Sequence, residues 1–198
     1  MALIKAKYRG LDSEAHNLVL LHTTDVTSDV SEVDIDGFFS SDYRNYKIII
    51  SNLKIDTDAQ VIRLRVNVGG SAFTTTGGYP TIGRYSRMKS DNTKSDSNQM
   101  GNYSTYAWSF LTWTNTIPNS GDRQGVHSEL LLTNPLDTSN YKAIYRTTNY
   151  IGKDSSNTYN LQETANTFVN TTSALSGIKF YPNSGNISNG NFKLYGIK

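Results

Sequence analysis

The sequence has no cysteine and only four prolines among its 198 residues. Disulfide scaffolds and thiolate metal sites are therefore excluded. No stretch approaches the roughly 18 apolar residues of a membrane-spanning helix, and residues 1–10 lack the apolar core of a secretory signal. Charged residues make up 18% of the chain, and the formal net charge is +2. We therefore expect neither membrane insertion nor a nucleic-acid partner, which usually requires a clustered basic face.

Recognisable catalytic motifs are also missing. The chain contains no Gly-x-Ser-x-Gly nucleophile elbow and no phosphate-binding loop. Its glutamates are too dispersed to nominate a glycosidase pair, whose carboxyl groups lie about 5–10 Å apart. We expect no enzymatic activity. The glutamates considered are Glu32, Glu129 and Glu163.

Metal ligands are similarly scarce. The histidines are not spaced as a metal-binding pair, and a zinc site without cysteine would need carboxylates as well. Residues 34–37 (DIDG) begin like a calcium loop but lack the further ligands that complete the coordination shell. We expect no metal and no cofactor. The three histidines are His16, His22 and His127.

Alternation of apolar and polar residues predicts an all-β fold. Residues 61–68 place Ile62, Leu64 and Val66 on one face and arginines on the other. Residues 46–51 contain the most β-prone run and predict a central strand. Turn signals recur about every 8–12 residues, and no amphipathic helix is visible. The sequence therefore predicts an antiparallel two-sheet jelly-roll sandwich of about ten strands.

The last 23 residues, 176–198, contain two further alternating segments. A polar, glycine-rich stretch separates them, which predicts a terminal hairpin that closes the domain. The residues expected to face the core are Ile178, Phe180, Phe192 and Leu194.

We divide the chain into an N-terminal arm, residues 1–17, and a β-domain, residues 18–198. Residues 74–102 are polar and lack apolar periodicity, which predicts a long loop, with one short strand conceivable at residues 79–88. The candidate contact surface in this loop is Tyr79, Arg84, Tyr85 and Arg87, and the candidate docking residues in the arm are Leu3, Ile4, Tyr8 and Arg9.

Aromatic residues support two interpretations. Residues 103–113 (YSTYAWSFLTW) predict a strand with aromatic residues on both faces. Trp108 and Trp113 are expected to fill the core, although a sugar-stacking platform with Tyr103, Tyr106 and the loop tyrosines remains the alternative.

Four segments resemble a jelly-roll domain of tailed-phage virion structural proteins. They are SDYRNYKIIISN, VGGSAF, TNPLDTSNYKAI and the terminal FYPNSGNISNGNFKLYGI. The opening MALIKAKYRGLD is similar to N-terminal segments of marine and cyanobacterial phage virion proteins. The likeness runs over residues 18–198 and is weakest across residues 74–102.

This resemblance implies a non-enzymatic virion structural protein, assembled in the host cytoplasm and displayed on the particle surface. We favour a capsid decoration or cement subunit that contacts other virion proteins through its arm and forms a homo-oligomer, most simply a trimer. The alternative is a tail-fibre or receptor-binding subunit that recognises a host glycan. A further alternative is a carbohydrate-binding module or glycan-active enzyme.

Overall fold

The computed structural model describes residues 18–57, 60–75, 77–103, 125–153 and 158–198. These residues form twelve strands in two antiparallel sheets and no helix, so none of them supplies a helix able to cross a membrane. The strands are β1 (Leu18–Val26), β2 (Val33–Asp36), β3 (Asn45–Ile55), β4 (Ile62–Val68), β5 (Ser71–Ala72), β6 (Tyr79–Lys89), β7 (Lys94–Tyr103), β8 (Val126–Thr133), β9 (Lys142–Lys153), β10 (Thr158–Val169), β11 (Gly177–Pro182) and β12 (Ile187–Ile197).

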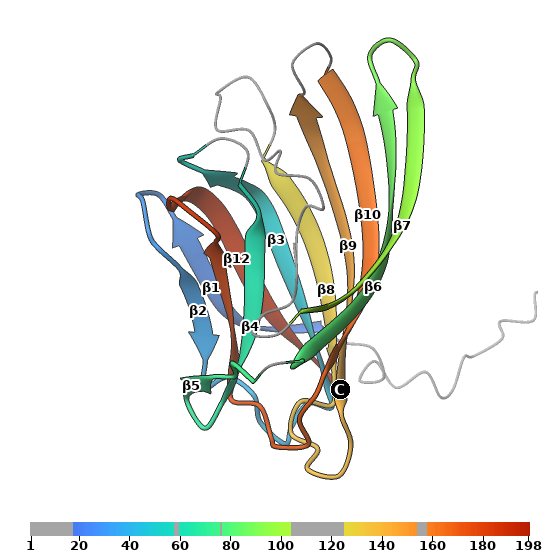
Figure 1. The fold of residues 1–198 in the computed structure, drawn as a ribbon. Coiled ribbons are helices and arrows are strands. Elements are labelled where there is room, and N and C mark those ends of the chain that lie inside the picture. The colour runs from blue at the N-terminus through green and yellow to red at the C-terminus, as the bar shows by residue number, and fades with distance from the viewer. Residues whose placement is uncertain (1–17, 58–59, 76, 104–124, 154–157) are drawn as a thin grey trace, which may run out of the picture.

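The two sheets differ in size. The large sheet has eight strands in the order β1-β12-β3-β8-β9-β10-β6-β7, and the small sheet has four in the order β2-β11-β4-β5. In Figure 1 the strands β9, β10, β6 and β7 extend beyond the ends of β2 and β4. The all-β, two-sheet prediction is confirmed, whereas the strand count is higher than the predicted ten.

The core lies between the inward faces of both sheets. Ile48 and Ile50 of β3 and Leu64 of β4 are completely or almost completely buried, and for Leu64 the alternation of residues 61–68 predicted this. Rings from the two sheets meet where Phe180 of β11 lies 5.5 Å, centroid to centroid, from Phe192 of β12. Asn67 departs from the predicted pattern, because its buried side-chain amide donates to Asp34 Oδ1 at 2.9 Å.

The predicted terminal hairpin is wrong, although its four core residues are indeed buried. Strand β11 pairs with β2 and β4, whereas β12 pairs with β1 and β3 in the other sheet. The polar segment between them therefore crosses from sheet to sheet. Asp56 holds this crossing by accepting hydrogen bonds from the backbone and side-chain amides of Asn186, both at 2.8 Å.

The predicted polar loop at residues 74–102 is also corrected. It forms the antiparallel hairpin of β6 and β7, joined by a tight turn in which Asn92 has a positive φ of 65°. The missing apolar periodicity has a physical reason: outside its first residues, β6 and the described side chains of β7 are half-buried or exposed. Residues Thr158–Val169 form one long strand, β10, inside the sheet between β9 and β6.

The large sheet has an outer face, defined here as the side chains that point away from the core. One register row crosses seven strands of this face and is largely apolar. In order from β1 to β6, its residues are Leu20, Tyr195, Lys47, Leu131, Tyr145, Asn166 and Ile82. Among the described residues, no strand packs on this face.

The carboxylates of Asp137 and Asp56, which lie in loops, predict that the free energy of unfolding decreases in acid. The side chain of Asn140 and the backbone N–H groups of Ser139 and Asn140 lower the pKa of Asp137, and Asn186 lowers that of Asp56. Each pKa is lower in the folded than in the unfolded state, so the stabilisation is complete above the unfolded value of about 3.9 and is lost as pH falls through the folded pKa.

We therefore expect the urea midpoint to decrease as pH is lowered below about 4. Asn140→Ala removes the main donor to Asp137, so it should raise the pKa of Asp137 in the folded state and flatten this acid dependence. Urea unfolding followed by circular dichroism at several pH values measures both effects. An unchanged pH profile in Asn140→Ala would show that these hydrogen bonds do not couple to folding.

Candidate functional site

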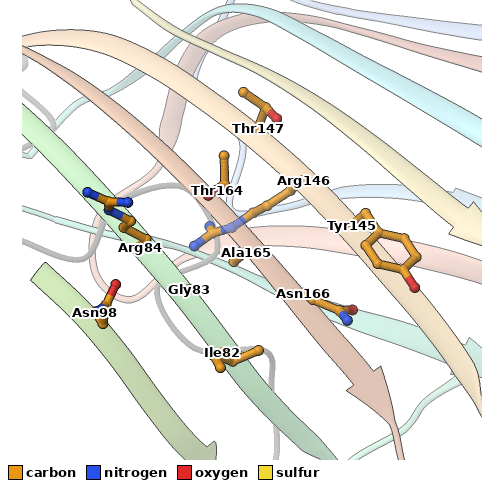
Figure 2. Close-up of a pocket in the computed structure, with 10 residues that line it drawn as sticks. All are labelled: Ile82, Gly83, Arg84, Asn98, Tyr145, Arg146, Thr147, Thr164, Ala165 and Asn166. Carbon is orange, nitrogen blue, oxygen red and sulfur yellow. The ribbon is translucent and has the colours of Figure 1, made fainter.

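The outer face is hollowed over β6, β7, β9 and β10. We call this hollow the Tyr145 groove; its volume is about 660 Å³. Figure 2 shows Tyr145 on one side of it, with Arg84 and Asn98 on the other. The lining residues are Ile82, Gly83, Arg84, Asn98, Tyr145, Arg146, Thr147, Thr164, Ala165 and Asn166.

Strand register assembles the groove from two neighbouring rows. Tyr145 lies opposite Asn166 in the first row. In the second, Thr164 is flanked by Thr147 and Arg84. Because alternate residues of a strand share a face, side chains of both rows point outward. The side chain of Thr164 is shorter than those of Arg84, Tyr145 and Asn166 around it, and this difference in length creates the depression.

The groove offers both apolar and hydrogen-bonding surface. Tyr145 is 47% exposed and Ile82 is 55% exposed, so both present large apolar area to solvent. Asn98, Asn166 and the threonines add amide and hydroxyl groups. Asn166 Oδ1 is shielded from solvent and accepts no hydrogen bond from the described residues. Such an orphaned acceptor costs about 1–3 kcal/mol, which a donor supplied by a ligand would offset.

A buried ion pair lies on the core side of the same strands. Arg146 Nη2 of β9 is 3.6 Å from Glu163 Oε2 of β10, and their side chains are 2% and 0% exposed. Burial lowers the pKa of the Arg146 guanidinium, and the charge of Glu163 opposes that shift. Because these charges face the core, they do not serve as free ionic groups in the groove.

Two further hollows continue along the outer face. The Asn160 hollow, about 410 Å³, is lined by Ser86, Arg87, Met88, Lys94, Asp96, Asn149, Asn160 and Gln162. The His127 hollow, about 460 Å³, is lined by Ile49, Ile50, Ser51, His127, Ser128, Glu129, Thr147 and Asn149. Thr147 also lines the Tyr145 groove, and Asn149 lines both smaller hollows. The three depressions are therefore contiguous.

The candidate contact surface is brought together only in part. Arg84 is exposed and lines the Tyr145 groove. Tyr79 was wrongly assigned to this surface: it is fully buried, and its hydroxyl donates to Phe73 O at 2.8 Å and accepts from Val66 N–H at 3.0 Å.

The other two candidates alternate with the residues of the outer face. Tyr85 packs against the core. Its register partner on β10, Glu163, is fully buried, and this identifies the Tyr85 side of β6 as the inward face. Arg87 is half-buried, and its Nε–H donates to Ser95 Oγ at 3.1 Å. The candidate set therefore mixes both faces of one strand.

Several other candidates lie outside the described residues. These are the arm residues Leu3, Ile4, Tyr8 and Arg9, together with His16, Tyr106, Trp108 and Trp113. Within the described part of the chain, no three histidine, aspartate or glutamate side chains gather as a metal-binding group. His22 stacks on Phe38, with ring centroids 4.2 Å apart.

Sequence reasoning missed Tyr145, Thr164 and Asn166. The signal for Tyr145 was present, because it lies between Ile144 and Arg146 in an alternating strand. Only the register of β10 against both β9 and β6 places these residues at one point of the face.

Comparison of the chain with protein-family models, curated proteins and solved structures gave no match. A functional assignment must therefore be argued from the geometry of the outer face and from the segments quoted above.

Proposed function

We propose that this chain is a non-enzymatic structural protein of a bacteriophage particle, displayed on its surface as a decoration or cement subunit. The observation that carries the proposal is an apolar patch at the open edge of the large sheet, next in sequence to the predicted arm. We call it the β1 patch; it consists of Leu18, Leu20, Tyr195 and Ile197.

The strand order supports the jelly-roll part of this proposal. Strands β1-β12-β3-β8 form one half of the large sheet, and β2-β11-β4-β5 form the small one. Two four-stranded sheets in which the chain passes repeatedly from one to the other are the arrangement of a jelly roll. In this description, β9, β10, β6 and β7 are additions to the first sheet.

The β1 patch suits contact between subunits. Leu18 and Leu20 are 46% and 52% exposed, although they are large aliphatic side chains. Among the described strands, β1 pairs only with β12, so its other edge presents backbone hydrogen-bonding groups. An exposed edge with apolar side chains binds a further strand through backbone hydrogen bonds and side-chain pockets. We commit to a second copy of this chain as the partner.

Charge placed on the β1 patch tests the proposal. We expect the purified chain to form a homo-oligomer, most simply a trimer, and Leu18→Glu/Leu20→Glu to be monomeric, because buried unpaired carboxylates oppose association. Light scattering coupled to size-exclusion chromatography measures the mass. Met88→Glu, on the opposite half of the same face, is the matched control and should leave the mass unchanged.

At a protein concentration low enough for the parent chain to be monomeric, the unfolding midpoints of both variants should remain close to that of the parent, since exposed sites usually change stability by less than about 0.5 kcal/mol. A parent chain that is strictly monomeric and does not bind phage particles would overturn the proposal.

A receptor-binding subunit of the tail is the second candidate, and the Tyr145 groove favours it because the groove has the size of a small-ligand site. Cryo-electron microscopy of particles that carry the chain separates the candidates. Copies spread over the shell support decoration, whereas copies confined to the tail support receptor binding.

A further inference from the structure

The Tyr145 groove combines an exposed aromatic ring with neutral hydrogen-bonding groups. From this combination we propose that the groove and the neighbouring Asn160 hollow bind a neutral, extended carbohydrate chain. This activity goes beyond assembly through the β1 patch and holds for a subunit on the head or on the tail. The part of the outer face between β9 and β7 therefore has a carbohydrate as its proposed ligand.

The apolar part of the groove matches the apolar face of a sugar ring. Tyr145 presents an exposed ring from β9, and Ile82 presents an exposed side chain from β6. In Figure 2 the two residues lie on the same side of Arg84, with Asn166 between them. Aromatic rings attract the C–H groups of a pyranose, while its hydroxyl groups remain at the edge of the contact.

The polar part of the groove matches those hydroxyl groups. Asn98 offers an exposed amide that donates and accepts at adjacent atoms, which suits neighbouring hydroxyls on one sugar ring. Asn166 Oδ1 has no hydrogen-bond donor among the described residues, so a rotation of this amide toward the groove would satisfy it with a ligand hydroxyl. Thr164, in the register row next to that of Tyr145 and Asn166, has a short side chain and leaves room for the ring of a sugar.

The charges of the groove favour a neutral ligand. Arg84 Nη2 lies 4.0 Å from Asp96 Oδ2, so a carboxylate already stands beside the exposed guanidinium. The other arginine of the lining, Arg146, has its charge on the core side next to Glu163. An acidic saccharide would meet the carboxylate of Asp96 as well as the cation, whereas a neutral one meets no opposing charge.

The length of the hollowed face favours a chain over a single sugar. The Asn160 hollow continues the groove along β10 toward Asn160 and Gln162, two more outward amides. Asn160 and Asn166 are six residues apart on one strand, a separation of about 20 Å at about 3.3 Å per residue. A monosaccharide would fill only part of this length, while an oligosaccharide would contact both ends.

Calorimetric titration of the full chain tests the proposal. The probes are cellohexaose, maltohexaose, chitohexaose and mannohexaose as neutral chains, glucose as a single sugar, and hexagalacturonate as an acidic chain. We expect at least one neutral hexasaccharide to bind at least about tenfold more tightly than glucose and hexagalacturonate, a difference of the size that one good contact supplies.

Variants of the tyrosine test the site itself. Tyr145→Ala should weaken binding of that hexasaccharide about tenfold, and Tyr145→Phe, which retains the ring, should bind nearly as the parent does. Tyr141→Ala is the matched control, because Tyr141 is 58% exposed but lines none of the three hollows. Saturation-transfer NMR should show contact from the protein to the C–H protons of the bound saccharide.

Three results would overturn the inference: no binding of any neutral hexasaccharide at millimolar concentration, preference for hexagalacturonate, or equal binding by Tyr145→Ala and Tyr141→Ala. Release of reducing sugar from the bound chain would contradict a binding role and indicate hydrolysis. Because each titration uses the isolated chain and leaves the β1 patch intact, its failure is separate from any failure of the virion assignment.

Discussion

Glu163→Gln is expected to lower the free energy of unfolding by about 3–5 kcal/mol, the range for breaking one partner of a buried ion pair. Arg146 Nη2 lies 3.6 Å from Glu163 Oε2, and both side chains are almost wholly removed from solvent. The variant leaves the guanidinium buried without its nearest carboxylate. Urea unfolding at neutral pH measures the loss.

The same substitution at an exposed ion pair gives the control. Lys47 Nζ lies 2.7 Å from Glu129 Oε2 with side chains 28% and 59% exposed, and Glu129→Gln should cost less than about 1 kcal/mol. The double variant Arg146→Met/Glu163→Leu should recover most of the loss, because an apolar pair avoids the desolvation of both charges. A loss below about 1 kcal/mol for Glu163→Gln alone would refute this account of the pair.

Phe192→Ala is also expected to lower the free energy of unfolding by about 3–5 kcal/mol. Phe192 is fully buried and contacts Phe180 of the opposite sheet. Truncation to alanine removes buried apolar surface and leaves a cavity where the two sheets meet. Thermal and urea unfolding measure the loss, and Phe192→Leu should lose less because it fills part of that cavity.

An exposed position on the neighbouring edge strand, β1, provides the comparison. Leu20→Ala should change stability by about 0.5 kcal/mol or less, because Leu20 is half exposed. A larger loss at Leu20 than at Phe192 would mean that the inward and outward faces of the large sheet have been exchanged.

Alternation was sufficient to predict much of the core. Residues such as Ile62, Leu64 and Leu194 are buried where the period of two placed them. Strand β4, Ile62–Val68, lies within the alternating segment predicted at residues 61–68. Periodicity works here because one face of each strand is apolar and the other is not.

The alternation of apolar and polar residues could not predict which strands pair with each other. The sequence around Gly185 is polar and turn-forming, which suits a hairpin turn and a crossing between sheets equally well. Whether this segment is a hairpin turn or a crossing depends on the strands with which β11 and β12 pair, and those strands lie far away in the sequence. Likewise, β6 and the described side chains of β7 include too few buried residues for an apolar pattern, so the pairing of β6 with β10 and with β7 could not be read locally.

The Tyr145 groove could be predicted only in part for the same reason. Arg84 was chosen as a polar residue in a supposed loop, and it does line the groove. Tyr79 was chosen by the same reasoning and is buried, because one strand carries both faces. Tyr145 lies on β9 and Asn166 on β10, and only the pairing of these two strands in the sheet places the two residues opposite each other.

The separation of β11 and β12 between the two sheets also affects how the protein is made. Each is an interior strand, β11 between β2 and β4 and β12 between β1 and β3. Among the described strands they are the last two in chain order, so neither sheet can close its ladder until β11 and β12 have been synthesised. Pairing across such sequence separations is slow. A nascent chain would meanwhile expose four unpaired strand edges, and such edges are prone to aggregate before folding is complete.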